Sequence, residues 1–295
     1  SSDSVNLNEL SVGGNLVVKS GNNIEITDID QHGNYLKLNA ENDVNLSSEK
    51  NEALSSLLSR RIEMQGNSIQ LDQVKLKSST DLIIRGEQRV DIGASTHLEA
   101  KLKKDEVLSI NASEVHLNDA TVYAESEVFK HNKSKVLLNG EQLLSIKGSS
   151  VELGANQLEA ELPKIELHGK RVVLDNSKVA QLHYFNFKSI ILREYAYWPP
   201  FLNGKKITLV KADDSFEMVN DSSIYMYTGD IQINSNDISL KDSMIINETT
   251  WPNFQTKVGE IKLDAKGDIT LVNSHISGIS QTWATRSSVN MKGSN

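Results

Sequence analysis

The side chains capable of acid–base chemistry form no familiar catalytic or metal-binding motif. The chain has seven histidines, and no two of them are four residues apart. It contains no glycine-rich phosphate loop, no H-E-x-x-H and no G-x-S-x-G sequence. His116, between Val115 and Leu117, is better explained as an outward surface residue than as a metal ligand. We therefore predict no catalytic residue, no metal site and no cofactor.

The composition excludes several classes of chemistry and partner. The 295 residues include no cysteine, which removes disulfides and thiolate nucleophiles. The formal net charge of −8 argues against nucleic acid as a partner, because that function requires clustered Lys and Arg. No stretch approaches the ~18 consecutive apolar residues of a membrane-spanning helix. We expect no nucleic-acid binding and no membrane insertion.

A short repeat dominates the sequence. Triplets in which two apolar residues flank a residue that is usually polar recur in steps of seven or eight. This alternation is typical of a short strand with one buried face. Gly, Asn, Asp and Ser separate the triplets, and these residues tolerate the left-handed conformations of sharp corners. In the middle of the chain the triplets are 136–138, 144–146, 151–153, 158–160, 165–167 and 172–174.

The repeat predicts a fold. Strands of three residues cannot form a self-sufficient sheet, but three per turn, with turns about 4.8 Å apart, make three parallel sheets around a narrow core. We predict an all-β, right-handed parallel β-helix, a solenoid of ten to twelve turns with about three short strands per 20–22-residue turn. An antiparallel β-sandwich or barrel is the alternative, but sandwich strands usually run five or more residues with wider spacing.

The step of seven also predicts which residues lie over one another. Three such steps in each turn put Glu166 over Ser145 and Val173 over Glu152, so carboxylates do not stack on carboxylates. Near the N-terminus, the triplet 16–18 recurs one turn later as 36–38.

Two segments depart from the repeat. Near the C-terminus the triplet 231–233 recurs only at 261–263, a spacing longer than one turn, which predicts an inserted loop. The segment 49–61 has leucines at helical spacing, so we predict a short helix or a loop on a corner there.

The triplet 244–246 is assigned to a strand with its apolar ends inward.

Aromatic residues gather in one segment. Ten of the sixteen Phe, Trp and Tyr residues lie between Tyr184 and Tyr227, where Pro199 and Pro200 cannot continue a central ladder. The segment either presents a binding surface or packs a loop against one sheet. We predict a β-helix shaft over 1–180, an aromatic-rich excursion over 181–228, and further β-helix over 229–295 with an inserted loop at 247–260. The predicted receptor- or ligand-binding residues are Tyr184, Phe185, Phe187, Tyr195, Tyr197, Trp198, Phe201, Trp251 and Phe254.

The stretches 14–26 and 35–46 resemble the short repeat of filamentous haemagglutinin-like exoproteins, approximately G-[ND]-L-x-L-x-A-G-x-[ND]-[IV]-x-L, and 229–280 is similar in kind. The family's N-P-N-type secretion signature is missing, and the repeat is eroded over 49–228. The resemblance implies a shaft or receptor-binding segment of a secreted bacterial cell-surface exoprotein. It also implies an outer-membrane secretion partner in a two-partner route, and a role as adhesin, haemagglutinin or carrier of a contact-dependent toxin.

These observations predict an extended adhesive scaffold, not an enzyme, that binds a receptor or glycan on a host or neighbouring cell. The alternative is a polysaccharide lyase or hydrolase, because such enzymes use the same fold with acids on an outer face. Two carboxylates at a fixed separation cannot be assigned from the sequence, and turn geometry explains Asp268, which occupies the same pre-strand corner as Asp237. The candidate acids are Asp213, Asp214, Asp242, Asp264 and Asp268.

Overall fold

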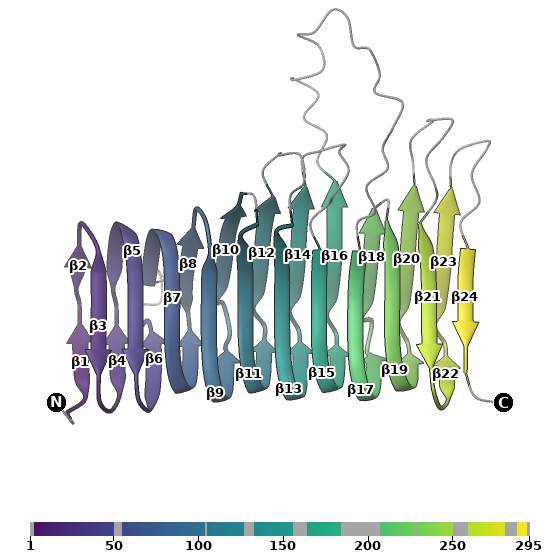
Figure 1. The fold of residues 1–295 in the computed structure, drawn as a ribbon, viewed down its shortest axis with the longest axis horizontal. Helices are drawn as coiled ribbons and strands as arrows, with labels where there is room; N and C mark the ends of the chain where they lie inside the picture. The colour runs from purple at the N-terminus through teal and green to yellow at the C-terminus, as the bar shows by residue number, and fades with distance from the viewer. Residues whose placement is uncertain are drawn as a thin grey trace, which may run out of the picture.

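The protein is a parallel β-helix whose turns are stacked along its long axis from the N-terminus to the C-terminus (Figure 1). The structure, a computed structural model, describes residues 3–49, 55–103, 105–126, 133–155, 164–183, 207–227, 229–249, 259–280 and 288–293. These residues form 24 strands, and every pairing between them is parallel. The predicted fold class is confirmed, and the antiparallel alternative is wrong.

The strands form three sheets, here called faces A, B and C, that follow one another in each turn. Each face contains eleven stacked segments of the described chain, within the predicted ten to twelve turns. Face A contains β3 (Leu16–Ser20), β21 (Glu260–Ala265) and β24 (Ser288–Lys292). Face B contains β1 (Val5–Asn8), β4 (Ile24–Thr27), β6 (Asp43–Ser47) and β22 (Ile269–Val272). Face C contains β2 (Ser11–Val12), β8 (Val74–Ser78), β10 (His97–Leu102), β12 (Thr121–Ser126), β14 (Ser150–Ala155), β16 (Lys178–His183), β18 (Ser223–Tyr227), β20 (Met244–Thr249) and β23 (His275–Ser280).

The remaining strands bend around a corner and belong to more than one face. β5 (Asp30–Ala40) continues from face C to face A, and β7 (Ser55–Asp72) runs through faces C, A and B. Six strands continue from face A to face B, with the register shifting at the corner: β9 (Leu82–Ile92), β11 (Val107–Asn118), β13 (Lys135–Lys147), β15 (Lys164–Asp175), β17 (Ile207–Val219) and β19 (Asp230–Lys241).

The core consists of columns of apolar side chains that run from turn to turn. In β13, Val136, Leu138, Leu144 and Ile146 point inward and are completely buried, whereas Leu137 and Ser145, which alternate with them, point outward. The column continues because Val136 pairs with Ile165 in the next turn. Burying one such side chain stabilises the fold by about 1.5–3 kcal/mol, and each turn can do so only against its neighbours.

The predicted registers are confirmed near both ends and wrong in the middle. Leu16 pairs with Leu36 and Ile231 with Ile261, as the repeats predict. Glu166, however, lies over Leu137, and Val173 lies over Ser145.

The turn in the middle is longer than the repeat predicts. Val136 pairs with Ile165, which is one triplet further along the chain than three steps would reach. The cause is that β14 ends at Ala155 and β15 begins only at Lys164. The triplet 158–160, which kept the step of seven in the sequence, lies outside the described residues. Carboxylates still do not stack, because Glu152 pairs with Tyr123 and Ala180.

Two segments predicted to leave the coil contain strands of it. In the segment 49–61, residues from Ser55 onward belong to β7, and Leu57 is completely buried. The prediction of a helix or loop is wrong for that part, because parallel partners in β5 and β8 favour the extended chain over the helical spacing of the leucines. In the segment 181–228, β17 and β18 are in register with their neighbours, and Phe216 is a completely buried core residue.

Candidate functional site

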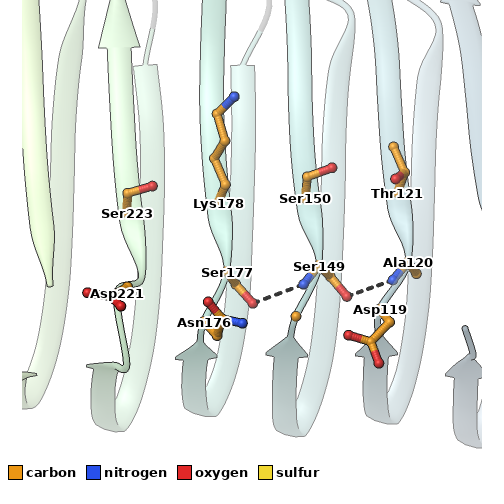
Figure 2. A pocket seen from close by; sticks show the side chains of 11 residues that line it. Asp119, Ala120, Thr121, Ser149, Ser150, Asn176, Ser177, Lys178, Asp221 and Ser223 are labelled. Carbon is orange, nitrogen blue, oxygen red and sulfur yellow. Dashed lines mark hydrogen bonds between the residues drawn. The ribbon is translucent and has the colours of Figure 1, made fainter. Parts of the chain in front are cut away.

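A polar groove lies along the corner between faces B and C (Figure 2). At this corner one residue, or two between β17 and β18, takes a left-handed backbone conformation, which lets two or three residues bend the chain from face B to face C. The φ angle is 51° at Asp119, 58° at Gly148, 48° at Asn176, 61° at Asp221 and 50° at Asp242. Asp, Asn and Gly are the residues that adopt this conformation at least cost, which explains the composition of the corner.

Serines that follow these corner residues form a ladder of hydrogen bonds from turn to turn. The backbone N–H of Ala120 donates to Ser149 Oγ at 3.0 Å, and that of Ser149 donates to Ser177 Oγ at 3.3 Å (Figure 2). The N–H of Ser177 donates in turn to Ser222 Oγ at 3.2 Å. Each hydroxyl also donates to a backbone carbonyl of its own corner; Ser149 Oγ, for example, donates to the carbonyl of Lys147 at 2.8 Å. The serines satisfy buried backbone groups.

The groove opens where Gly148 interrupts the column of corner side chains. It has a volume of about 350 Å³ and is lined by backbone and by polar side chains. A Cβ on Gly148 would overlap the Asp119 carboxylate, so this carboxylate occupies the space that a side chain at Gly148 would take. The charged side chain on the other rim, Lys178, is paired with Glu152 at 2.9 Å. The groove can accept hydrogen bonds from a polar ligand, but its serine hydroxyls are already engaged in the ladder.

The acids of the enzymatic alternative are not brought together. Asp213 and Asp214 lie at the bend of β17 between faces A and B, and Asp264 is on face A, paired with Lys262 at 3.2 Å. Asp242 lies at the corner between faces B and C and accepts a hydrogen bond from Asn273 Nδ2 at 3.1 Å.

Asp268 lies at a corner equivalent to that of Asp237, because Ile238 pairs with Ile269. The Asp237 carboxylate has a structural role there, since its Oδ1 accepts a hydrogen bond from the backbone N–H of Asp268 at 3.0 Å. Among the residues that the structure describes, no three His, Asp or Glu side chains are placed to hold a metal ion.

The predicted binding residues lie outside the described part of the chain. The structure describes neither 184–206 nor 250–258, and these two segments contain all nine of them: Tyr184, Phe185, Phe187, Tyr195, Tyr197, Trp198, Phe201, Trp251 and Phe254. Two other members of the aromatic cluster, Tyr225 and Tyr227, are in β18 and point outward on face C.

Tyr225 and Tyr227 belong to an outward patch that we call the tyrosine surface: the outward side chains of β18, β20 and β23. Tyr225 lies beside Ile246, and Tyr227 beside Glu248. The Tyr225 hydroxyl donates to Glu248 Oε2 at 2.6 Å. Partial burial, together with this carboxylate, raises the pKa of Tyr225 above its usual value.

Sequence reasoning missed most of this surface because it assigned the wrong phase to one triplet. Residues 244–246 were expected to bury their apolar ends, but Ile245 is the completely buried residue and Met244 is 43% exposed. The residues Tyr225, Met226 and Tyr227 alternate in the same inverted sense, with Met226 inside. The signal in the sequence that could have located this surface was a pair of tyrosines, at 225 and 227, with apolar residues that point outward one turn later, at 244 and 246.

Comparisons of the chain with protein-family models, with curated proteins and with solved structures find no match. In the described residues there is also no helix long and apolar enough to cross a membrane.

Proposed function

We propose that this chain is a segment of a secreted bacterial cell-surface exoprotein and works as an extended adhesive scaffold. In this proposal it binds a receptor or glycan on a host or neighbouring cell, and the parent chain is exported by an outer-membrane secretion partner. The resemblance of 14–26 and 35–46 to filamentous haemagglutinin-like repeats supports the family assignment. The arrangement of the connections between the strands supports the scaffold role.

The corners from face A to face B and from face B to face C are short in most turns. Two residues separate β13 from β14, and two separate β15 from β16 and β19 from β20. The third corner, from face C to face A, varies widely: two residues separate β18 from β19, ten separate β20 from β21, and 23 separate β16 from β17. The longest connections are therefore at one edge of the rod, although seven residues also separate β6 from β7 at the corner from face B to face C. Binding residues are often carried by connections of variable length on a regular scaffold, and this edge is the observation that carries the proposal.

The predicted binding residues belong to two of these variable connections. Tyr184 to Phe201 follow the end of β16, and Trp251 and Phe254 follow the end of β20. β16 and β20 both pair with β18, so the points where the two connections leave the coil are two turns apart, about 10 Å. Eleven turns give a rod about 50 Å long, which would project such a surface away from its point of attachment.

The test is a binding assay on whole cells. The triple variant Tyr195→Ala, Tyr197→Ala, Trp198→Ala should lose cell binding and keep the circular dichroism spectrum and thermal midpoint of the parent chain. Tyr35→Ala, which removes an outward tyrosine from face A, is the matched control and should bind normally. If the folded triple variant still binds cells normally, these three residues are not the adhesive site.

The enzymatic alternative has its own assay. Incubation with uronate polymers, with and without calcium, should yield no unsaturated products. Their appearance would replace the adhesive proposal with a lyase.

A further inference from the structure

We infer that the tyrosine surface binds a neutral glycan, and that its ligand contacts are made by Tyr225, Tyr227 and Glu248. The inference rests on the proposed adhesive function and gives it a ligand class.

The surface is a regular grid on face C. Three outward positions in each of β18, β20 and β23 lie side by side, because Tyr225 pairs with Ile246 and Ile246 with Ser277. One flanking row contains Tyr227, Glu248 and Ile279, and the other contains Ser223, Met244 and His275. Met244 and Ile279 are 43% and 39% exposed. Together with the partly exposed Tyr225, Ile246 and Tyr227, they give the C-terminal end of face C an apolar outer surface.

The chemistry of the grid suits a sugar ring. Tyrosine rings and the neighbouring aliphatic side chains offer flat apolar contact to the C–H face of a pyranose, and the tyrosine hydroxyls add polar edges. The bond from Tyr225 to Glu248 Oε2 holds this carboxylate in place. The second carboxylate oxygen, Glu248 Oε1, is the acceptor that the grid offers to a sugar hydroxyl. Charge-assisted hydrogen bonds of this kind are about twice as strong as neutral ones.

The charge of the grid selects the class of glycan. None of its nine positions is Lys or Arg, and the one carboxylate is that of Glu248. A uronate, sulfated or sialylated chain would place its anion near this carboxylate. The outward tyrosine on face A, Tyr35, lies beside cationic side chains instead. Its hydroxyl donates to Glu63, and Glu63 is paired with Lys37 at 3.2 Å and with Arg61 at 2.8 Å.

The nine positions of the grid cover less area than a protein–protein interface needs, and face C continues beside them in β16. Three strands and three outward positions cover about 10 Å by 13 Å. A stable protein–protein interface buries about 800 Å² on each partner, several times this area. A short stretch of oligosaccharide matches the grid.

The experiment measures binding of the full chain to an array of immobilised neutral oligosaccharides built on galactose, glucose or N-acetylglucosamine, with matched sulfated and uronate-containing oligosaccharides. Binding to at least one neutral ligand is expected, and Tyr225→Ala and Tyr227→Ala should each weaken it about tenfold or more, the upper range for loss of one aromatic contact. Glu248→Gln should weaken binding of the neutral oligosaccharide and should not create binding to the sulfated ones.

Tyr35→Ala is the matched control and should bind as the parent chain does. Absence of binding to every neutral oligosaccharide, preference for the sulfated ones, or unchanged binding by both tyrosine variants would each overturn the inference. So would binding of a protein receptor that the two tyrosine variants abolish while no glycan binds. These outcomes are separate from the cell-binding test, because a chain that binds cells through 184–206 and ignores the array keeps the adhesive function and loses this site.

Discussion

Gln31 and Asn247 make the same hydrogen bond at the same corner of the coil, near opposite ends of the rod. Each amide lies inside face C and donates to the carbonyl of a glycine that precedes a face A strand: Gln31 Nε2 to Gly14 at 2.8 Å and Asn247 Nδ2 to Gly229 at 2.7 Å. Both side chains are almost completely buried. The bond satisfies a backbone carbonyl at a corner where the chain leaves the ladder, a requirement for any buried polar group.

The first prediction concerns this bond. Asn247→Ala should lower the free energy of unfolding by about 1–3 kcal/mol, because it leaves the buried Gly229 carbonyl without a donor. Urea denaturation measures the change. Asn234→Ala, on the outward side of β19, is the control and should stay within about 0.5 kcal/mol of the parent chain. Equal effects of the two variants would mean that the corner bond contributes nothing.

The second prediction concerns the glycine beside this bond. A Cβ on Gly259 would overlap the carbonyl oxygen of Gly229 and Asn247 Nδ2, and backbone cannot yield as a side chain does. Gly259→Ala should therefore destabilise the protein by about 1–3 kcal/mol. Gly13→Ala is the matched control, since nothing lies within 4 Å of the added atom. The prediction fails if the thermal midpoints of the two variants coincide.

The third prediction tests the serine ladder. Ser177 Oγ donates within its own corner to the Asp175 carbonyl at 2.7 Å and accepts from the Ser149 N–H at 3.3 Å. Ser177→Ala should cost about 1–2 kcal/mol, because it strips partners from two buried backbone groups. Ser150→Ala, whose side chain points outward from β14, should cost much less. Hydrogen exchange at the amide of Ser149 gives a local measurement, and unchanged protection there would contradict the role of the ladder.

The fourth prediction is a pH dependence. Burial opposes ionisation of Glu63, but hydrogen bonds from Tyr35 and Lys37 outweigh it and hold the pKa of this carboxyl below its usual value. A carboxyl with a lowered pKa contributes stability that is fully present above the pKa of the unfolded chain and is lost as the pH falls through the folded value. Glu63→Gln should therefore be less stable than the parent chain near neutral pH, and the difference should shrink in acid. Urea midpoints at several pH values measure this.

A matched control for the pH experiment is Glu87→Gln, at an exposed bend of β9. As an exposed substitution, it should stay within about 0.5 kcal/mol of the parent chain near neutral pH. A constant difference for Glu63→Gln across the same range would show that the ion cluster on face A has no net effect on stability.

The fold was predictable because its repeat is local. Leu16 and Leu36, or Ile231 and Ile261, are fixed over one another by triplets that the sequence displays directly. The register between Val136 and Ile165 was not predictable, because the triplet 158–160 keeps the same step of seven where no described strand follows it. A period alone cannot distinguish a strand from a connection with the same pattern.

The candidate site was predictable only in part. The aromatic cluster includes Tyr225 and Tyr227, but Tyr225 was not singled out within it, since the direction of its ring depends on whether Met226 is inside. Glu248 has no distinguishing pattern in the sequence, and its place beside Tyr227 follows from the pairing of β18 with β20. The pairs Gly148-Ser149, Asn176-Ser177 and Asp242-Ser243 recur visibly and are the signal that could have located the corner groove.

The unequal turns also determine how the rod would respond to tension. Leu16 lies over Leu36, and Ile165 lies over Thr208, so the chain between the first pair is less than half as long as that between the second. At about 3.4 Å for each extended residue, peeling off the first of these turns would release about 70 Å of chain and the second about 150 Å. Unwound from one end, the molecule would therefore lengthen in uneven increments, and the turn from β15 to β17 would add more length than the turn from β3 to β5.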